Sequence, residues 1–349
     1  MNDREQRFFS KQASKQAREE WIDVIKGFLI FLVVIGHCIL TISADSILLK
    51  AIVIFIYSFH MPLFFIMSGY LFNKKYNFNV FLLKKFKSLI LPYIMFIIVD
   101  SLVEILFGVY SVKSFVENIS AGYKDIVLMT TKSQYSSLWF LPAMFFGILI
   151  VYGIEKNIND KIIKWVISIF ILSLSQIWYK SGIESFFCIR EAMIAQFFII
   201  LGYESRDKIN NVFLNATFSR LILFLIVWVI SIIEWVGNHN SIINYWNSDV
   251  TPVSWSIVLA IMGSLALISF VGIWLNYRRM LYKLMIILGE NSLYIYGFHY
   301  IFIRVIPQLI SKYYNAYLSV AISTFAVLLC AMLITIVYRN IKKIIILKE

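Results

Sequence analysis

The amino-acid sequence predicts an all-α polytopic membrane protein of about ten transmembrane helices, with both termini in the cytoplasm. Of its 349 residues, 60% are hydrophobic and only 15% are charged, whereas about 25% of the residues in a soluble protein are charged. Apolar runs of about 17 to 25 residues, the length that crosses a bilayer, recur along the chain. They leave no polar stretch long enough for a separate soluble domain.

The expected spans follow these apolar runs in chain order. They cover residues 22–42, 51–72, 89–108, 138–154, 164–179, 191–204, 219–236, 253–275, 284–305 and 317–338. The runs at 164–179 and 191–204 are short, so one of them could be a re-entrant element. The polar segments at 109–137 and 237–252 form the main external surface, where Tyr and Trp suit either a sugar or the membrane interface.

The distribution of Lys and Arg orients these spans. With the N-terminus inside, the cytoplasmic segments hold 23 of the 32 Lys and Arg, and the external loops hold seven. The positive-inside rule therefore places both termini in the cytoplasm. Residues 1–20 and 339–349 are then cytoplasmic tails around one integral domain at 21–338, with no cleaved signal peptide. Because topology accounts for the net charge of +12, no nucleic-acid partner is expected.

The first span, WIDVIKGFLIFLVVIGHCIL, carries ionisable residues on one face. Helical geometry returns His37 to within about 20° of Lys26, roughly 16 Å further along the axis, and Asp23 shares this face. Such residues are costly in hydrocarbon and mark a functional site by default. His37 is predicted to be a base or nucleophile, or else it packs against a backbone carbonyl. Lys26 could meet a phosphate or pantetheine group, or snorkel to the interface.

The second span contains SFHMPLFFIMSGYLF, which places His60 at a depth similar to that of His37. Pro62 removes one backbone hydrogen bond and is predicted to bend the helix. Ser68 and Gly69 permit close approach of a neighbouring backbone. His60 either partners His37 and orients an acceptor, or packs beside the bend.

Basic residues then gather in two cytoplasmic loops. NKKYNFNVFLLKKFKSLILPY carries Lys84, Lys85 and Lys87, and NYRRMLYK carries Arg278 and Arg279. These side chains could hold the phosphates of an anionic cofactor such as coenzyme A. The alternative is that they set topology and contact lipid head groups.

The ninth span contains GENSLYIYGFHYIF, with Glu290 and Asn291 in the cytoplasmic third and His299 in the outer half. A carboxylate at that depth needs a partner, and Lys26 is a plausible one.

Asp100 and Glu104, at i and i+4 of the third span, line an outer cavity or satisfy buried polar neighbours. Neither the four His nor the three Cys have metal-ligand spacing, so no metal is expected.

Taken in order, these motifs resemble the membrane-bound acyltransferase 3 family. WIDVIKGFLIFLVVIGHC is similar to the family's first-helix signature, in which a His follows a basic residue. FHMPLFFIMSGYLF, KKFKSLILPY, LWFLPAMF, FFIILGY and GENSLYIYGFH follow in the family's order, so the resemblance extends from Trp21 to about Tyr338. The FHMPLFF…SGYLF form is most similar to the branch named for fucose O-acetyltransferases.

The resemblance implies a multi-pass O-acetyltransferase of the bacterial inner membrane. Such an enzyme moves an acyl group, usually acetyl, from cytoplasmic acetyl-CoA to a hydroxyl of a surface polysaccharide or of its lipid-linked precursor. Capsule and lipopolysaccharide are the expected polymers, and membrane lipids are the remaining partners. No metal is implied.

The resemblance also assigns residues. His37 matches the family's essential His, and Lys26 matches its basic partner, with Asp23 beside it. Lys84 and Lys87 occupy the spacing of a basic pair that is often Arg, but Lys makes point contacts where Arg makes bidentate ones. The residues expected to contact the substrate or support the site are His60, Ser68, Trp139, Glu290, Asn291 and His299.

Two routes are open for His37, which could remove the hydroxyl proton as a general base or carry the acyl group as an acetyl-imidazole.

Two other functions compete with transfer. A transporter of a glycan or lipid-linked sugar would use the same polar face as a path, although no inverted repeat or pair of broken helices is evident. A structural subunit of an export complex would leave Lys26 and His37 without a purpose.

Overall fold

The computed structural model describes residues 3–42, 46–106, 128–129, 136–239, 243–245, 248–275 and 280–346. Within these ranges, only the backbone is described for residues 3–19, 104–106, 136, 239 and 341–346. The elements in its first half are α1 (Asp3–Ile42), α2 (Ile47–Tyr57), α3 (His60–Tyr70), α4 (Phe78–Lys85), the π-helical turn η1 (Phe86–Ile90), α5 (Leu91–Leu106), the 3₁₀ turn η2 (Ser136–Leu138), α7 (Phe140–Asn157) and α8 (Lys161–Lys180). Those in its second half are α9 (Ile189–Glu204), α10 (Arg206–Leu214), α11 (Phe218–His239), α12 (Val253–Trp274), α13 (Met280–Glu290), α14 (Ser292–Ile303), α15 (Ile306–Ile310) and α16 (Ala316–Ile346).

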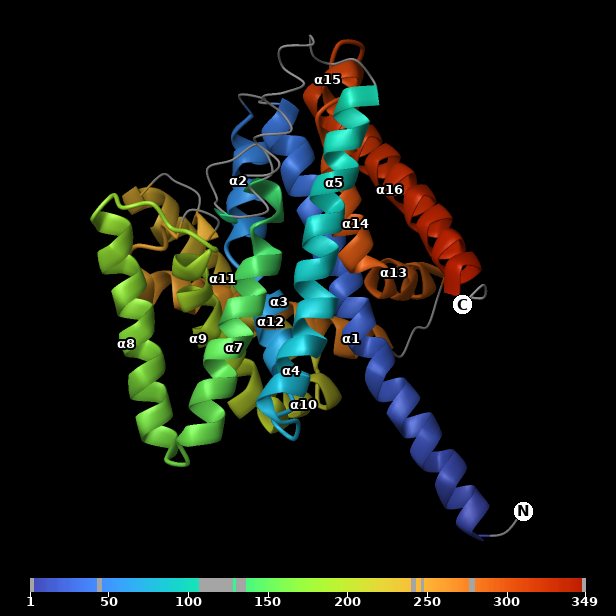
Figure 1. The fold of residues 1–349 in the computed structure, drawn as a ribbon. Helices are drawn as coiled ribbons and strands as arrows, with labels where there is room; N and C mark the ends of the chain where they lie inside the picture. Colours follow the sequence, from blue (N-terminus) through green and yellow to red (C-terminus); the bar gives the residue numbers. More distant parts are fainter. Residues whose placement is uncertain are drawn as a thin grey trace.

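The predicted all-α polytopic fold is confirmed. Figure 1 shows a helical bundle, and eight helices in the described ranges are long and apolar enough to cross a membrane. They correspond to eight of the ten expected spans. The other two spans, at 191–204 and 284–305, correspond to shorter helices. The first helix, α1, is continuous from Asp3, so it begins well before the expected boundary at 22.

Although helix α9 is short, residues near its two ends contact residues near the two ends of α8. Its sixteen residues rise about 24 Å. Near one end of the pair, Glu204 lies 3.5 Å from Lys164. Near the other, the Arg190 guanidinium lies 5.6 Å from the ring centroid of Tyr179. These contacts make α9 antiparallel to α8, although α9 is not among the eight described helices that are long and apolar enough to cross a membrane.

The expected ninth span is broken, which corrects the prediction of one helix at 284–305. Helix α13 ends at Glu290, and α14 begins at Ser292. In Figure 1, α13 lies across the direction of α14. The side-chain amide of Asn291 donates to the carbonyl of Ile287 at 2.7 Å. It thereby satisfies one of the carbonyls that a helix end leaves without a partner.

The predicted bend of the second span is present as a break between α2 and α3 at Ser58 and Phe59. Pro62 lacks the N–H that would bond the carbonyl four residues earlier, which is that of Ser58. The Ser58 hydroxyl donates to the carbonyl of Phe55 at 2.8 Å and accepts from the Trp228 indole at 3.1 Å. The break brings His60 to the first turn of a new helix.

Close helix crossings at glycine fix the centre of the bundle. A β carbon at Gly69 of α3 would overlap the carbonyl of Ile199 on α9, and one at Gly202 of α9 would overlap the carbonyl of Ile66. Helices α1 and α13 cross in the same way at Gly27 and Gly289. Lipid tails are as apolar as the core, so close packing of this kind holds membrane helices together.

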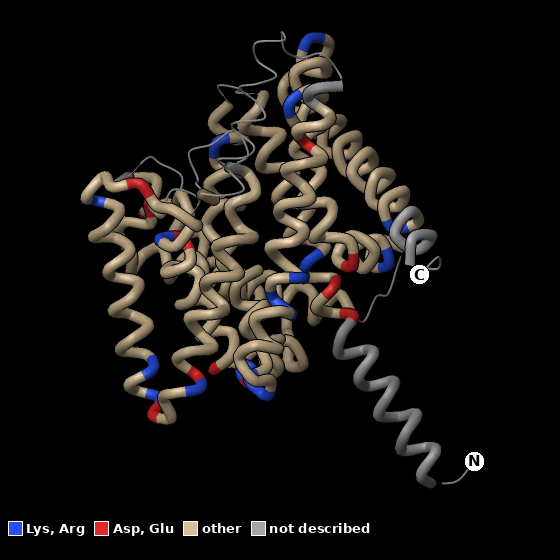
Figure 2. The backbone as a smooth tube through the Cα atoms, in the orientation of Figure 1, with Lys and Arg blue, Asp and Glu red and all other residues tan. Residues whose placement is uncertain are grey.

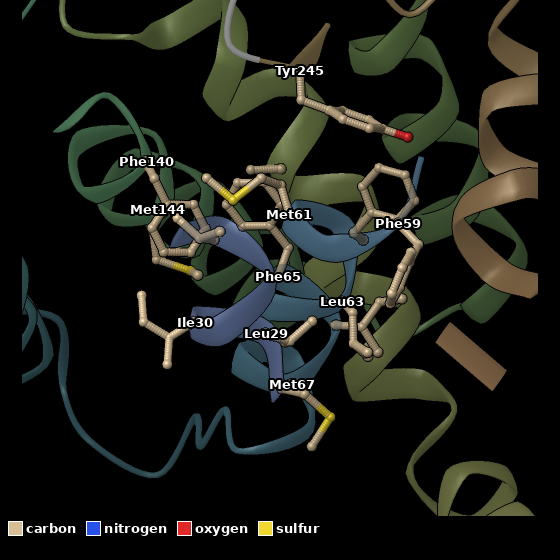
Figure 3. Close-up of a cluster of buried hydrophobic side chains, with 14 of the residues drawn as sticks. Leu29, Ile30, Phe59, Met61, Leu63, Phe65, Met67, Phe140, Met144 and Tyr245 are labelled. Carbon is tan, nitrogen blue, oxygen red and sulfur yellow. The ribbon is translucent and has the colours of Figure 1, made fainter. Parts of the chain in front are cut away.

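The buried core extends through most of the described helices, and one cluster in it is formed by side chains of α1, α3 and α7 (Figure 3). Figure 3 shows Leu29 and Ile30 of α1 beside Met61 and Phe65 of α3, with Phe140 of α7 nearby. The rings of Phe65 and Phe140 have centroids 5.0 Å apart. Figure 2 shows that the central lengths of α7, α8 and α16 carry no charged residues, whereas the turn between α7 and α8 carries several.

That charged turn contains a buried ion pair. Lys164 lies 2.8 Å from a carboxylate oxygen of Glu155, and the Glu155 side chain is fully buried. Lys74 approaches the same oxygen at 3.3 Å. Removing one partner of such a pair would leave an uncompensated buried charge, so the network fixes the ends of α7, α8 and α9 together.

The glycine crossings predict a clear difference between two glycine-to-alanine substitutions. Gly69→Ala should lower stability by about 1–3 kcal/mol, because the methyl group must displace the backbone of α9. Gly153→Ala is the matched control, since nothing lies within 4 Å of that position and Ala favours a helix. Thermal unfolding in detergent measures both midpoints. Equal midpoints for the two variants would show that α3 and α9 do not pack this closely.

Candidate functional site

Three of the four histidines meet in the interior of the bundle. The ring centroids of His37 on α1 and His299 on α14 are 5.3 Å apart. His60, at the start of α3, has its ring centroid 4.9 Å from that of Tyr57. His37 is half-buried, and the other two histidines are buried. Within the described ranges, no group of three or more His, Cys, Asp or Glu side chains is placed to hold a metal ion.

A cavity of about 400 Å³, here called the outer cavity, adjoins these histidines. It is lined by His37, Leu40, Thr41, Tyr57, His60, Met61, Ser137, Trp139, Asn244, Tyr245, Tyr296 and Tyr300. None of these lining residues is Lys, Arg, Asp or Glu, and five are Tyr or Trp. Aromatic side chains with a few hydroxyl and amide groups suit a neutral, hydroxyl-rich ligand.

A second cavity of about 230 Å³, here called the inner cavity, lies toward the other end of α1. Its polar lining residues are Lys26, Ser68, Lys85, Ser88 and Ser292. Apart from Tyr296, the rest of the lining is apolar and includes Met67 and Met144, whose flexible side chains adapt to irregular ligands. This cavity therefore joins a cationic, hydroxyl-bearing group of residues to an apolar wall.

The two cavities share a partition. Met61 and Tyr296 line both of them. The Tyr296 hydroxyl donates to the carbonyl of Ser137, which holds the ring in place, whereas Met61 is an unbranched side chain with several rotatable bonds. Met61 is therefore the more adaptable of the two side chains that the cavities share.

Lys26 pairs with Asp23 within α1, its ammonium lying 2.9 Å from a carboxylate oxygen. Both side chains are partly exposed, and Lys26 lines the inner cavity. The expected pairing of Lys26 with Glu290 is not present, because Glu290 lies at the exposed end of α13. Asn291 bonds the α13 backbone instead of lining either cavity. Both residues lie where the predicted ninth span is broken, and not within an uninterrupted helix.

The three lysines expected at the cofactor site have different surroundings. Lys85 lines the inner cavity. Lys84 is exposed, with its ammonium 3.5 Å from the ring centroid of Tyr76, and Lys87 is also exposed. Successive helical residues point about 100° apart, so these side chains cannot all face one cavity. Of the three expected lysines, the structure thus brings Lys85 to the inner cavity, whereas Lys84 and Lys87, which occupy the spacing of the family's basic pair, do not line it.

The remaining expected site residues are divided between the two cavities. Ser68 lines the inner cavity, and His60 and Trp139 line the outer one. The Nδ1–H of His60 also donates to the carbonyl of Ile56 at 2.8 Å, which fixes the ring at the break between α2 and α3. Arg278 and Arg279 lie outside the described residues.

Sequence reasoning missed the tyrosines of the outer cavity. Tyr296 and Tyr300 lie at i and i+4 on α14, one turn apart on the face toward the cavity. Tyr57 ends α2 beside the Pro62 break. The i, i+4 spacing in SLYIYGFHY was a usable signal, but aromatic residues are common in membrane helices for other reasons.

Tyr245 lines the outer cavity from the segment before α12. The buried carboxylate of Glu191 holds this segment in place. The hydroxyl of Ser248 donates to Glu191 at 3.0 Å, and Arg190 pairs with the same carboxylate at 3.1 Å. Burial raises the pKa of the Tyr245 phenol, and its protonated hydroxyl donates to the carbonyl of Ser256 at 3.4 Å.

Asp100 has a structural partner. Its carboxylate lies 3.3 Å from the guanidinium of Arg304, which in turn lies 4.8 Å from the ring centroid of Tyr300. Asp100 lines neither cavity. The ion pair therefore supports Tyr300 at the edge of the outer cavity, and the side chain of Glu104 lies outside the described residues.

Comparison with known proteins gives one match. The model of the acyltransferase 3 family, described as an acyltransferase domain, matches residues 19–338. No curated protein and no solved structure matches the chain. The matched range includes both cavities and every described residue that lines them.

The two cavities predict labelling from opposite sides of the membrane. In a variant whose three cysteines are replaced by alanine, Ser292→Cys should react with a membrane-impermeant thiol reagent only from the cytoplasmic side. Thr41→Cys should react only from the external side. Ser269→Cys is the control and should stay unlabelled, since Ser269 is fully buried. Labelling of both cavity cysteines from one side would contradict the assigned topology.

Proposed function

The chain belongs to the acyltransferase 3 family, and on that premise we propose that it moves an acyl group across the partition between its two cavities. The donor occupies the inner cavity and the acceptor hydroxyl occupies the outer one. The observation that carries the proposal is that Met61 and Tyr296 line both cavities, with His37 on the outer one.

The proposed donor is cytoplasmic acyl-CoA, with acetyl as the acyl group. The basic loops indicate that the inner cavity faces the cytoplasm. Lys26 and Lys85 offer positive charge to the phosphates of coenzyme A, and the apolar lining suits a thioester arm. A cavity of about 230 Å³ fits the pantetheine end and a short acyl chain, so the nucleotide would stay among the basic residues outside it.

The proposed acceptor is a neutral sugar hydroxyl of a surface polysaccharide, or of its lipid-linked precursor, such as a capsule or lipopolysaccharide unit. The described lining of the outer cavity has no charged residue to compensate a carboxylate or phosphate. Burying an uncompensated charge there would be costly. Tyr and Trp faces pack against sugar rings, and Asn244 and Thr41 can bond hydroxyls. The cell location that fits this donor and acceptor is the bacterial inner membrane.

The reaction needs a group that takes up one proton and that lies between the acyl donor and the acceptor hydroxyl. His37 takes the proton of the sugar hydroxyl while the hydroxyl oxygen bonds to the thioester carbonyl carbon. The carbon–sulfur bond then breaks, and the departing thiolate takes the proton from His37. Acyl ester and free coenzyme A result, with His37 again neutral. General base catalysis of this kind contributes about 10²- to 10⁴-fold, and the rest comes from positioning in a water-poor cavity.

An acyl-imidazole route uses the same histidine, because His37 would attack the thioester and pass its acyl group to the hydroxyl. Both routes require the imidazole, and they differ in whether an acyl-enzyme accumulates when no acceptor is present.

The proposal predicts loss of a glycan ester when His37 is replaced. In cells that lack the gene, the wild-type chain should restore acetyl esters on surface glycans, as detected by mass spectrometry. His37→Gln should restore none, because its amide cannot take the proton, and kcat should fall by about 10²- to 10⁴-fold. Thermal unfolding verifies that the variant is folded. A folded His37→Gln protein that restores the ester in full would overturn the proposed function.

Neighbouring lysines allow a matched test of the donor site. Lys85→Met should raise the KM for acetyl-CoA by about tenfold, the usual effect of losing one charge-assisted contact. Lys84→Met removes the same charge one residue away, from a side chain that lines neither cavity, and should leave KM within about twofold. Steady-state kinetics in nanodiscs measures both. Equal effects would mean that only the general positive charge of the loop matters.

A further inference from the structure

His299 has a tautomer that the surrounding backbone fixes. Its Nδ1 lies 2.7 Å from the carbonyl oxygen of Tyr296. A carbonyl only accepts hydrogen bonds, so Nδ1 carries the proton and Nε2 of the neutral ring is an acceptor. His299 is fully buried, and its Nε2 has no hydrogen-bond partner within the described part of the chain.

A buried acceptor without a partner costs about 1–3 kcal/mol, so this atom calls for a donor nearby. Among the rings beside His299, that of His37 is the nearest, with its centroid 5.3 Å from that of His299 and its plane inclined by 45°. His299 is not among the residues that line the outer cavity. It can therefore influence a ligand in that cavity through His37.

A histidine base needs a hydrogen-bond acceptor for the N–H on its far side, because that bond fixes the tautomer and aims the free nitrogen. The other rings beside His37 belong to Tyr57 and Tyr300, at 6.4 and 6.1 Å between centroids. Each of these hydroxyls can both donate and accept, so neither fixes the direction of a hydrogen bond to His37, whereas Nε2 of His299 can only accept. The carboxylate of Asp100 pairs with Arg304 through Oδ2, and its Oδ1 has no hydrogen-bond partner within the described residues. No contact in the described part of the chain joins Asp100 to His37. Nε2 of His299 is thus the described atom best suited to accept.

We propose that His299 is the positioning residue of His37. Nε2 of His299 accepts a hydrogen bond from the ring N–H of His37, directly or through one water. This leaves the other nitrogen of His37 unprotonated and directed at the outer cavity. When His37 takes the hydroxyl proton, the bond to His299 persists, and the proton later leaves with the thiolate. The catalytic consequence rests on the proposed function, whereas the hydrogen bond itself does not.

Two substitutions separate positioning from packing. His299→Leu removes the acceptor and should lower kcat by about 10- to 100-fold, the usual effect of losing a group that orients a functional side chain. The KM for acetyl-CoA should be unchanged. His299→Gln can place its amide oxygen near the lost Nε2, so it should recover most of the lost kcat. A His299→Leu protein with wild-type kcat, or a His299→Gln protein as slow as His299→Leu, would overturn the proposal.

A spectroscopic readout is independent of turnover. In protein labelled with ¹⁵N-histidine, the His37 signals, assigned by their loss in His37→Gln, should report one tautomer in the wild type and a mixture in His299→Leu. Unchanged His37 signals in His299→Leu would contradict the hydrogen bond. If the wild-type protein transferred no acyl group at all, the proposed function would fail, while these spectra would still decide whether His299 positions His37.

Discussion

A polar or charged side chain within the hydrocarbon layer must be paired or must face an enclosed cavity, and the arrangement of this protein follows from that constraint. Lys26 meets it with Asp23 and the inner cavity. Asp100 meets it with Arg304, and Glu155 with Lys164. His37 and His60 meet it by lining the outer cavity, and His299 meets it at Nδ1, which donates to the carbonyl of Tyr296. Because lipid cannot satisfy any of these groups, each of them fixes where neighbouring helices must lie.

Because the site is divided into two cavities, the proposed acyl transfer runs from the inner cavity to the outer one. In the proposed reaction, Met61 and Tyr296 separate the thioester in the inner cavity from the acceptor hydroxyl in the outer one. The glycine crossings hold α3 against α9 and α1 against α13, so the helices that carry His60, Lys26 and His37 are rigidly set. The side chain of Met61 is the adaptable part of the partition. A rigid frame with one flexible side chain between two compartments suits a transfer in which the reactants approach from opposite sides.

Helical periodicity allowed much of this site to be predicted from the sequence. Lys26 and His37 share a face because eleven residues make almost whole turns, and Pro62 marked the break that positions His60. Lys84, Lys85 and Lys87 could not be distinguished, because their directions depend on how α4 meets the π-helical turn at Phe86–Ile90. The break at Asn291 was missed although the polar stretch 289–292 interrupts the apolar run, because the apolar residues on both sides together have the length of one span. Tyr57 and Tyr300 were missed because membrane helices use aromatic residues for packing as often as for binding.

The most direct test of the central claim is a transfer assay with the two reactants on opposite sides of a membrane. The protein is reconstituted into sealed vesicles with its basic face outward, labelled acetyl-CoA is supplied outside, and the glycan acceptor is enclosed. We expect ester-linked label on the enclosed glycan with the wild-type protein and none with His37→Gln. Label that reaches only a glycan mixed with the donor on the same side would contradict a transfer between two opposed cavities.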